Sequence, residues 1–169
     1  LRMSRGLGDV YKRQEQDCLN LVAMQAPVAG DWRRIASIMR MISDLERIAD
    51  HCSDISEYVI NLSERPRITP PEGLSTMLSR VKSMLHTSVT AYVALDVEAA
   101  QKVVAQDDAQ DDAFDQMRNT LCELMAEHPE NIPQYVDYLM IAKYLERMSD
   151  HTTNLAEWIA YIVRGVLVN

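Results

Sequence analysis

Acidic side chains recur at helical spacing in two matching segments of the chain. Residues 45–57 read LERIADHCSDISE and residues 145–157 read LERMSDHTTNLAE, with a constant offset of 100 and six identical positions. A helix with this spacing carries its carboxylates on one stripe beside the apolar face. The first stripe holds Glu46, Asp50, Asp54 and Glu57, and the second holds Glu146, Asp150 and Glu157, with Asn154 in place of a carboxylate. Carboxylate oxygens bind hard or borderline cations, so these stripes indicate a metal site.

A third acidic row precedes the second copy. Asp107, Asp111 and Asp115 follow one another at i, i+4 and i+8, beside an apolar face, whereas Asp108 and Asp112 point further outward. Two such helices packed antiparallel would face two acidic rows across a groove, where repulsion between like charges favours a bound cation. Metal binding is one interpretation of these rows. Hydrated acidic ridges are the other, because runs of charge are usually solvent faces.

Long helices must position these rows. Prolines divide the chain at Pro27, Pro66–Pro71 and Pro129–Pro133, and no strand alternation competes between them. We expect one helix between Pro27 and Pro66, two helices within 72–128 that break near Leu95–Asp96 with Asp96 as a cap, and a last helix over 132–164 before Gly165. The first of these carries an apolar seam at alternating spacings of three and four, formed by Ile35, Ile38, Ile42, Leu45, Ala49, Cys52, Ser56 and Val59.

Composition restricts the function classes. The chain has 169 residues, with 17 basic and 25 acidic side chains and a net charge of −8. An acidic chain gains nothing from a phosphate backbone, so nucleic acid is not an expected partner. No apolar run is long enough to insert into a membrane. Three isolated cysteines predict reduced thiols in a cytoplasmic protein, and Cys52 is expected to be a small core residue.

The first fourteen residues, LRMSRGLGDVYKRQ, differ from the rest of the chain. They contain two of the five glycines and four of the seventeen basic residues. We interpret residues 1–14 as a non-native tail derived from sequencing-adapter text, with a disordered basic tail as the alternative. The remaining chain divides into residues 15–66, the remainder of a first bundle, and residues 72–168, a second bundle.

Two segments of the chain resemble the PhoU family of phosphate-uptake regulators. The first is Leu21–Val59, in which Ala26-Pro27-Val28-Ala29 and Asp44-Leu45-Glu46-Arg47-Ile48-Ala49-Asp50-His51 match the family pattern. The second is Leu145–Gly165, which resembles the second copy of the family motif. The resemblance implies an all-α fold of tandem three-helix bundles, of which the first is incomplete in this chain.

The resemblance also implies a function. Members of the family are cytoplasmic and often homodimeric, and they are negative regulators without known enzymatic activity. They link the ATP-binding subunit of the phosphate ABC transporter to a sensor histidine kinase in the phosphate-starvation response. Several bind metal clusters of iron or of divalent ions such as Mn, Mg or Zn. Carried over to this chain, the ligand motifs fall on Glu46, Asp50, Asp54, Asp107, Asp111, Glu146 and Asp150.

Two features depart from the family or limit the sites. Gln110 stands where the family prefers an apolar residue, and the acidic row that would face Glu46, Asp50 and Asp54 is absent from this chain. The first site is therefore half a site at best, whereas Asp107 and Asp111 with Glu146 and Asp150 form a complete one. His51 and His151 are expected to point toward solvent or a neighbouring element and not to bind metal.

Two alternatives remain open. A structural helical scaffold would carry the same acidic ridges without metal. A di-metal carboxylate enzyme would use Glu-x-x-His on its helices, and this pattern does not occur in the sequence. The sequence also contains no Gly-rich phosphate loop. We therefore expect a regulatory protein that is not an enzyme.

Overall fold

The fold is built from helices. The computed structural model describes residues 2–165, with side chains from residue 8 onward, and these residues form only helices and their connections. The predicted all-α class is confirmed. The elements in chain order are α1 (Arg2–Gln25), α2 (Ala29–Ser63), α3 (Leu74–Ala94), α4 (Val97–Val104), α5 (Asp107–Glu127), a 3-10 turn (Pro129–Asn131) and α6 (Ile132–Arg164).

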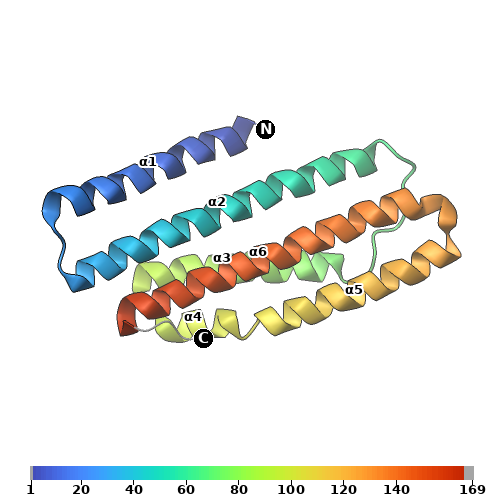
Figure 1. Cartoon of the computed structure of the whole chain (residues 1–169). Helices are drawn as coiled ribbons and strands as arrows, with labels where there is room; N and C mark the ends of the chain where they lie inside the picture. The colour runs from blue at the N-terminus through green and yellow to red at the C-terminus, as the bar shows by residue number, and fades with distance from the viewer. Residues whose placement is uncertain (1, 166–169) are drawn as a thin grey trace.

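The two longest helices, α2 and α6, form the centre of the molecule (Figure 1). They run antiparallel along each other, α1 lies along α2, and α3, α4 and α5 pack against α6. The second bundle is thus complete, with α4 and α5 together serving as one of its three rods, whereas α1 and α2 form an incomplete first bundle, as predicted. Most of the fully buried side chains come from the second bundle, among them Met77, Met84, Leu121, Leu145, Leu155 and Ile159.

The predicted helix ends are found at two places. Leu95 ends α3 in a left-handed conformation (φ 53°), and the Asp96 side chain accepts a hydrogen bond of 3.0 Å from the Ala99 N–H at the start of α4. At the other end of the bundle, Gly165 terminates α6 with φ 76°, a conformation that glycine adopts without steric cost.

A second break, between α4 and α5, was not predicted. We expected one helix after Asp96, but the helix stops at Val104 and restarts at Asp107. Tertiary contacts hold the first turn of α5. Arg80 of α3 donates from Nη1 to the Ala109 carbonyl and to the Gln110 side chain, both at 2.9 Å, and Gln110 is fully buried.

The predicted apolar seam of α2 is only partly buried. Helix α2 packs on α6 through residues that directly precede the predicted seam positions in the sequence. They include Met41, Ile48 and His51. The C-terminal part of the predicted seam is exposed, so the prediction that Cys52 lies in the core is wrong. In the second copy the matching positions are buried, as for Thr152 and Ile159. Helix α3 packs along that face of α6, whereas Cys52, Ser56 and Val59 of α2 remain exposed in the part of the chain that the structure describes.

The start of the chain belongs to α1. Residues 2–14 form the first half of this helix, so the alternative of a disordered tail is wrong for the residues that the structure describes. That residues 1–14 are non-native stays a prediction, because a helical conformation says nothing about origin. The division into units at 15–66 and 72–168 also stays a prediction. None of the described helices combines the length and the apolar character needed to cross a bilayer.

Candidate metal centre

Three of the predicted ligands meet between α5 and α6. Asp111 of α5 and Glu146 and Asp150 of α6 each offer one carboxylate oxygen, and these atoms all lie within 4.8 Å of one another. We call these three residues the acidic cluster. Glu146 and Asp150 are one helical turn apart, so the period of α6 places them side by side. The packing of α5 on α6 adds Asp111 from the opposite side.

Asp107 lies at the edge of the acidic cluster. Its carboxylate accepts a hydrogen bond of 2.8 Å from the Ser149 hydroxyl, so a residue of α6 holds the side chain in place. Glu157, one turn beyond Asn154, extends the acidic row. Burial raises its pKa, and the charges of Asp107 and Asp44 raise it further. The sequence predicted Asp107 as a ligand, and the structure places it next to the cluster but outside the group of three.

The acidic cluster concentrates negative charge around a partly buried Glu146, with Asp111 and Asp150 exposed on either side of it. Burial raises the pKa of Asp150 from 3.8 to about 6, and the charges of Glu146, Asp107 and Asp111 add to the rise. The pKa of Asp111 is also raised, first by burial and then by Asp107, Glu146 and Asp108. Crowded carboxylates destabilise one another in their ionised form, and a cation bound among them would remove that penalty.

Lys143 supplies the nearest positive charge. Its ammonium nitrogen donates a hydrogen bond of 2.7 Å to Glu146 Oε1 and lies 2.6 Å from Glu146 Oε2. The same nitrogen lies 4.9 Å from the centre of the Phe114 ring on α5. The sequence prediction missed this residue, although its position three residues before Glu146 was a usable signal.

The donor set of the acidic cluster fits a hard or borderline cation. It offers carboxylate oxygens alone, without an imidazole or thiolate, which suits Mg²⁺, Mn²⁺ or iron better than a metal that prefers sulfur. The ligand atoms come from two helices, and an ion held by all three residues would therefore connect α5 to α6. The residues present thus fit the metal that the family resemblance implies.

The first acidic row is not assembled into such a group. Asp54 lies with one oxygen 3.4 Å from Nδ1 of His51. Glu46 and Asp50 lie near Tyr11 of α1, whose pKa is raised by burial and then by their two charges. Within the described part of the chain, the acidic cluster of α5 and α6 is the only group of three potential metal ligands whose atoms converge. That Glu46, Asp50 and Asp54 form part of a metal site stays a prediction.

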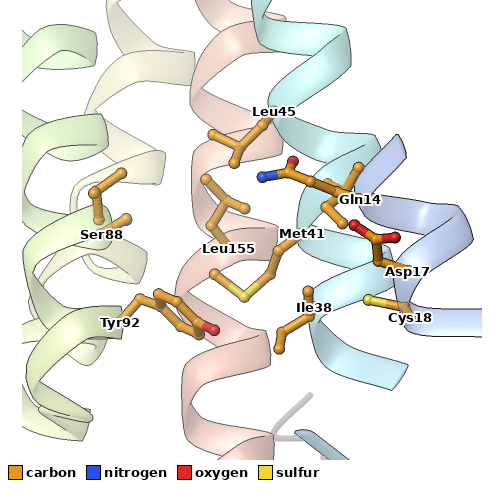
Figure 2. Close-up of a pocket in the computed structure, with 11 residues that line it drawn as sticks. Gln14, Asp17, Cys18, Ile38, Met41, Leu45, Ser88, Tyr92 and Leu155 are labelled. Carbon is orange, nitrogen blue, oxygen red and sulfur yellow. The ribbon is translucent and has the colours of Figure 1, made fainter. Parts of the chain in front are cut away.

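An apolar cavity of about 340 Å³ lies where α1, α2, α3 and α6 meet (Figure 2). Figure 2 shows Met41 and Ile38 of α2 facing Tyr92 of α3, with Leu155 of α6 between them and Cys18 of α1 at the far side. On α2 the lining residues are Ile38, Met41, Ile42 and Leu45. Their counterparts on α6 are all buried and are Tyr138, Ile141, Ala142 and Leu145. The cavity thus opens over the part of α2 that corresponds to the buried core face of α6.

Known proteins with the same sequence pattern identify the family. The chain matches the family described as the PhoU domain over residues 1–59 and 74–159. The phosphate-specific transport system accessory protein PhoU homolog of Clostridium acetobutylicum is 34% identical over 164 residues, covering 96% of this chain and 75% of that protein. The homolog from Synechocystis sp. is 32% identical over 163 residues, covering 96% and 72%.

Solved structures agree with the sequence match. The phosphate transport system regulatory protein PhoU from Streptococcus pneumoniae superposes with a TM-score of 0.92 at 28% identity, covering 99% of this chain and 79% of that one. PhoU from Pseudomonas aeruginosa superposes with a TM-score of 0.88 at 29% identity, covering 98% and 81%. Sequence and structure lead to one conclusion: the chain belongs to the PhoU family.

Proposed function

We propose that this chain is a regulatory accessory protein of phosphate uptake. The observation that supports this role best is 34% identity, over nearly the whole chain, to a protein named as an accessory of the phosphate-specific transport system. In this proposal the chain acts in the cytoplasm as a homodimer and as a negative regulator. It binds the ATP-binding subunit of the phosphate ABC transporter and a sensor histidine kinase, and it joins phosphate transport to the phosphate-starvation response.

The second part of the proposal is that the acidic cluster binds a divalent or iron centre. Its support is the convergence of Asp111, Glu146 and Asp150, together with the raised pKa of two of them. When bound, the metal would neutralise the carboxylates and connect α5 to α6. Ser149 holds the neighbouring Asp107, so that a fourth carboxylate is fixed beside the cluster.

The proposed role is binding and not catalysis. The names of the relatives describe accessory proteins of a transport system, which supports a regulatory role for this chain. The competing interpretations make separate predictions. A structural scaffold would bind no metal, and a di-metal enzyme would show turnover that depends on Asp111.

Metal binding is tested on the purified full chain. The measurements are elemental analysis and thermal unfolding with and without a chelator, for the native chain and for Asp111→Asn and Asp150→Asn. We expect bound metal, and a Tm that falls when the metal is chelated, for the native chain but not for Asp111→Asn or Asp150→Asn, because a ligand that binds the folded state stabilises it. Asp112→Asn is the matched control, since Asp112 is an exposed aspartate on the same helix. Equal metal content in all four proteins would contradict the proposed site.

The regulatory role needs its own test. The chain is expressed in a bacterium that lacks its own PhoU-family protein, and a reporter of the phosphate-starvation response is measured at high phosphate. We expect the chain to lower the reporter and to co-purify with the transporter's ATP-binding subunit. An unchanged reporter, with neither the subunit nor the kinase recovered, would count against the regulatory role and leave the metal proposal untouched.

A further inference from the structure

Lys143 pairs with Glu146, one of the three carboxylates of the acidic cluster. Its ammonium donates a hydrogen bond of 2.7 Å to Glu146 Oε1 and forms an ion pair with Oε2 at 2.6 Å, whereas Oε2 is buried and accepts no hydrogen bond from the residues that the structure describes. The Glu146 side chain is only 14% exposed and the Lys143 side chain is 36% exposed. The pair is therefore shielded from water on one side, and ammonium contacts of this kind are stronger there than at an open surface.

The influence of Lys143 reaches the other two ligands. Burial and neighbouring carboxylates raise the pKa of Asp111 and of Asp150, and in both groups the charge of Lys143 opposes that rise. Contact with the Phe114 ring fixes the ammonium against α5. One lysine thus sits between the two helices that supply the three carboxylates.

We propose that Lys143 is a tethered counter-ion that competes with a divalent metal for the acidic cluster, so that the metal binds in exchange for the ammonium. This inference rests on the proposed metal site. A metal ion and an ammonium held by the same carboxylate of Glu146 repel each other, so each weakens the binding of the other. Lys143 therefore lowers the affinity of the acidic cluster for metal. When no metal is present, its charge reduces the repulsion among the carboxylates.

The internal repeat provides the substitution that tests this idea. At the position that matches Lys143, the first copy carries Ser43, so Lys143→Ser changes the second copy to the residue of the first. Lys82→Ser on α3 is the matched control, because Lys82 is an exposed lysine on a helix away from the acidic cluster. Lys143→Arg keeps a positive charge at the position and serves as the conservative variant.

The experiment measures binding of Mn²⁺ to the full chain by calorimetry near neutral pH, together with thermal unfolding in the presence of a chelator. Loss of one charge-assisted contact corresponds to about a tenfold change in affinity. We expect Lys143→Ser to bind Mn²⁺ about tenfold more tightly than the native chain, and Lys82→Ser and Lys143→Arg to bind like the native chain. In chelator, Lys143→Ser is expected to melt at a lower temperature, because the carboxylates then lack their counter-ion.

The outcomes separate this inference from the metal proposal. If the native chain binds Mn²⁺ and Lys143→Ser binds no more tightly, the competition is refuted and the metal site stands. If neither protein binds Mn²⁺, the metal site itself is wrong and the competition with it. If Lys143→Ser fails to fold, Lys143→Met replaces it, since methionine keeps an apolar stem against Phe114 while removing the charge.

Discussion

His51 and His151 stack on each other across the interface between α2 and α6, with their ring centroids 5.6 Å apart. The two residues occupy the same position in the two copies of the repeat, so α2 and α6 contribute equivalent side chains to this contact. Their surroundings nevertheless differ. Asp44 Oδ1 lies 2.9 Å from His151 Nδ1, whereas its counterpart Tyr144 stacks on His51 at 5.2 Å. Both histidines contact a neighbouring element, which is one of the two placements predicted for them.

The first prediction concerns this stack. His51 is 9% exposed and contacts two aromatic rings, so His51→Ala should leave a cavity between α2 and α6. We expect it to lower the free energy of unfolding by about 1–3 kcal/mol. Urea unfolding followed by circular dichroism measures the change. His86→Ala is the control, because His86 is exposed on α3, and a loss of equal size in both variants would show that the stack contributes nothing.

The second prediction uses two positions related by the repeat. Ile159 on α6 is fully buried, whereas its counterpart Val59 on α2 is 52% exposed. We expect Ile159→Ala to cost about 2–5 kcal/mol of stability, because it removes buried methyl groups from a packed core. Val59→Ala should change stability by no more than about 0.5 kcal/mol. Chemical denaturation measures the free energy of unfolding of both variants. Similar losses of stability would contradict the prediction and would mean that the face of α2 around Val59 is covered in solution.

The third prediction concerns an ion pair that ties the end of the first bundle to α6. Arg65 lies just after α2 and donates a hydrogen bond of 2.7 Å to Asp137 Oδ2. The Asp137 side chain is 10% exposed, and the Arg65 side chain is 39% exposed. A double-mutant cycle with Arg65→Ala and Asp137→Ala should give a coupling energy of about 1–2 kcal/mol after allowance for screening. Additive effects of the two substitutions would refute the coupling.

The fourth prediction is a pH dependence of stability in the presence of a chelator. The pKa of Asp150 is 3.8 in an ordinary environment and about 6 in the folded chain, because of burial and the charges of Glu146, Asp107 and Asp111. The folded chain therefore holds a proton on Asp150 over a range in which the unfolded chain has lost it. This group's contribution to stability falls as the pH rises from about 4 to about 6, and it stays constant above that range.

Asparagine at position 150 does not ionise and removes this contribution. We therefore expect Asp150→Asn to gain stability relative to the native chain as the pH rises from about 4 to about 6. The measurement is urea unfolding of both proteins at several pH values. Asp112→Asn should follow the native chain throughout, since Asp112 lies on the exposed side of α5. A difference between native chain and Asp150→Asn that does not vary with pH would contradict the prediction.

Features fixed by local geometry could be predicted from the sequence. Glu146 and Asp150 share one helix at i and i+4, so the helical period alone places them together. Asp96 begins α4 because its side chain accepts a hydrogen bond from the backbone, and Gly165 ends α6 because it adopts a left-handed conformation. Both effects act within a few residues. The position of Asp111 beside Glu146 and Asp150 could also be predicted, because antiparallel packing of the two helices in a bundle brings their acidic rows together.

Features set by tertiary contacts could not be predicted in the same way. Periodicity finds the apolar faces of α2, but which face is buried depends on which other helix is present to cover it. Nothing at Ala105–Gln106 is a helix breaker, and the interruption there accompanies contacts from Arg80 of α3. The spacing of Lys143 and Glu146 pointed to an ion pair, but the contact of the Lys143 ammonium with Phe114 of α5 depends on how the two helices pack.

The interruption between α4 and α5 has an electrostatic consequence. A helix that begins at Asp107 exposes the free amide groups of its first turn there, and these carry a partial positive charge. A continuous helix through this region would have used those amides in its own backbone hydrogen bonds. The gap of two residues thus gives the backbone at the start of α5 a fixed partial positive charge, which favours the negative charges of Asp107 and Asp108 in the first turn.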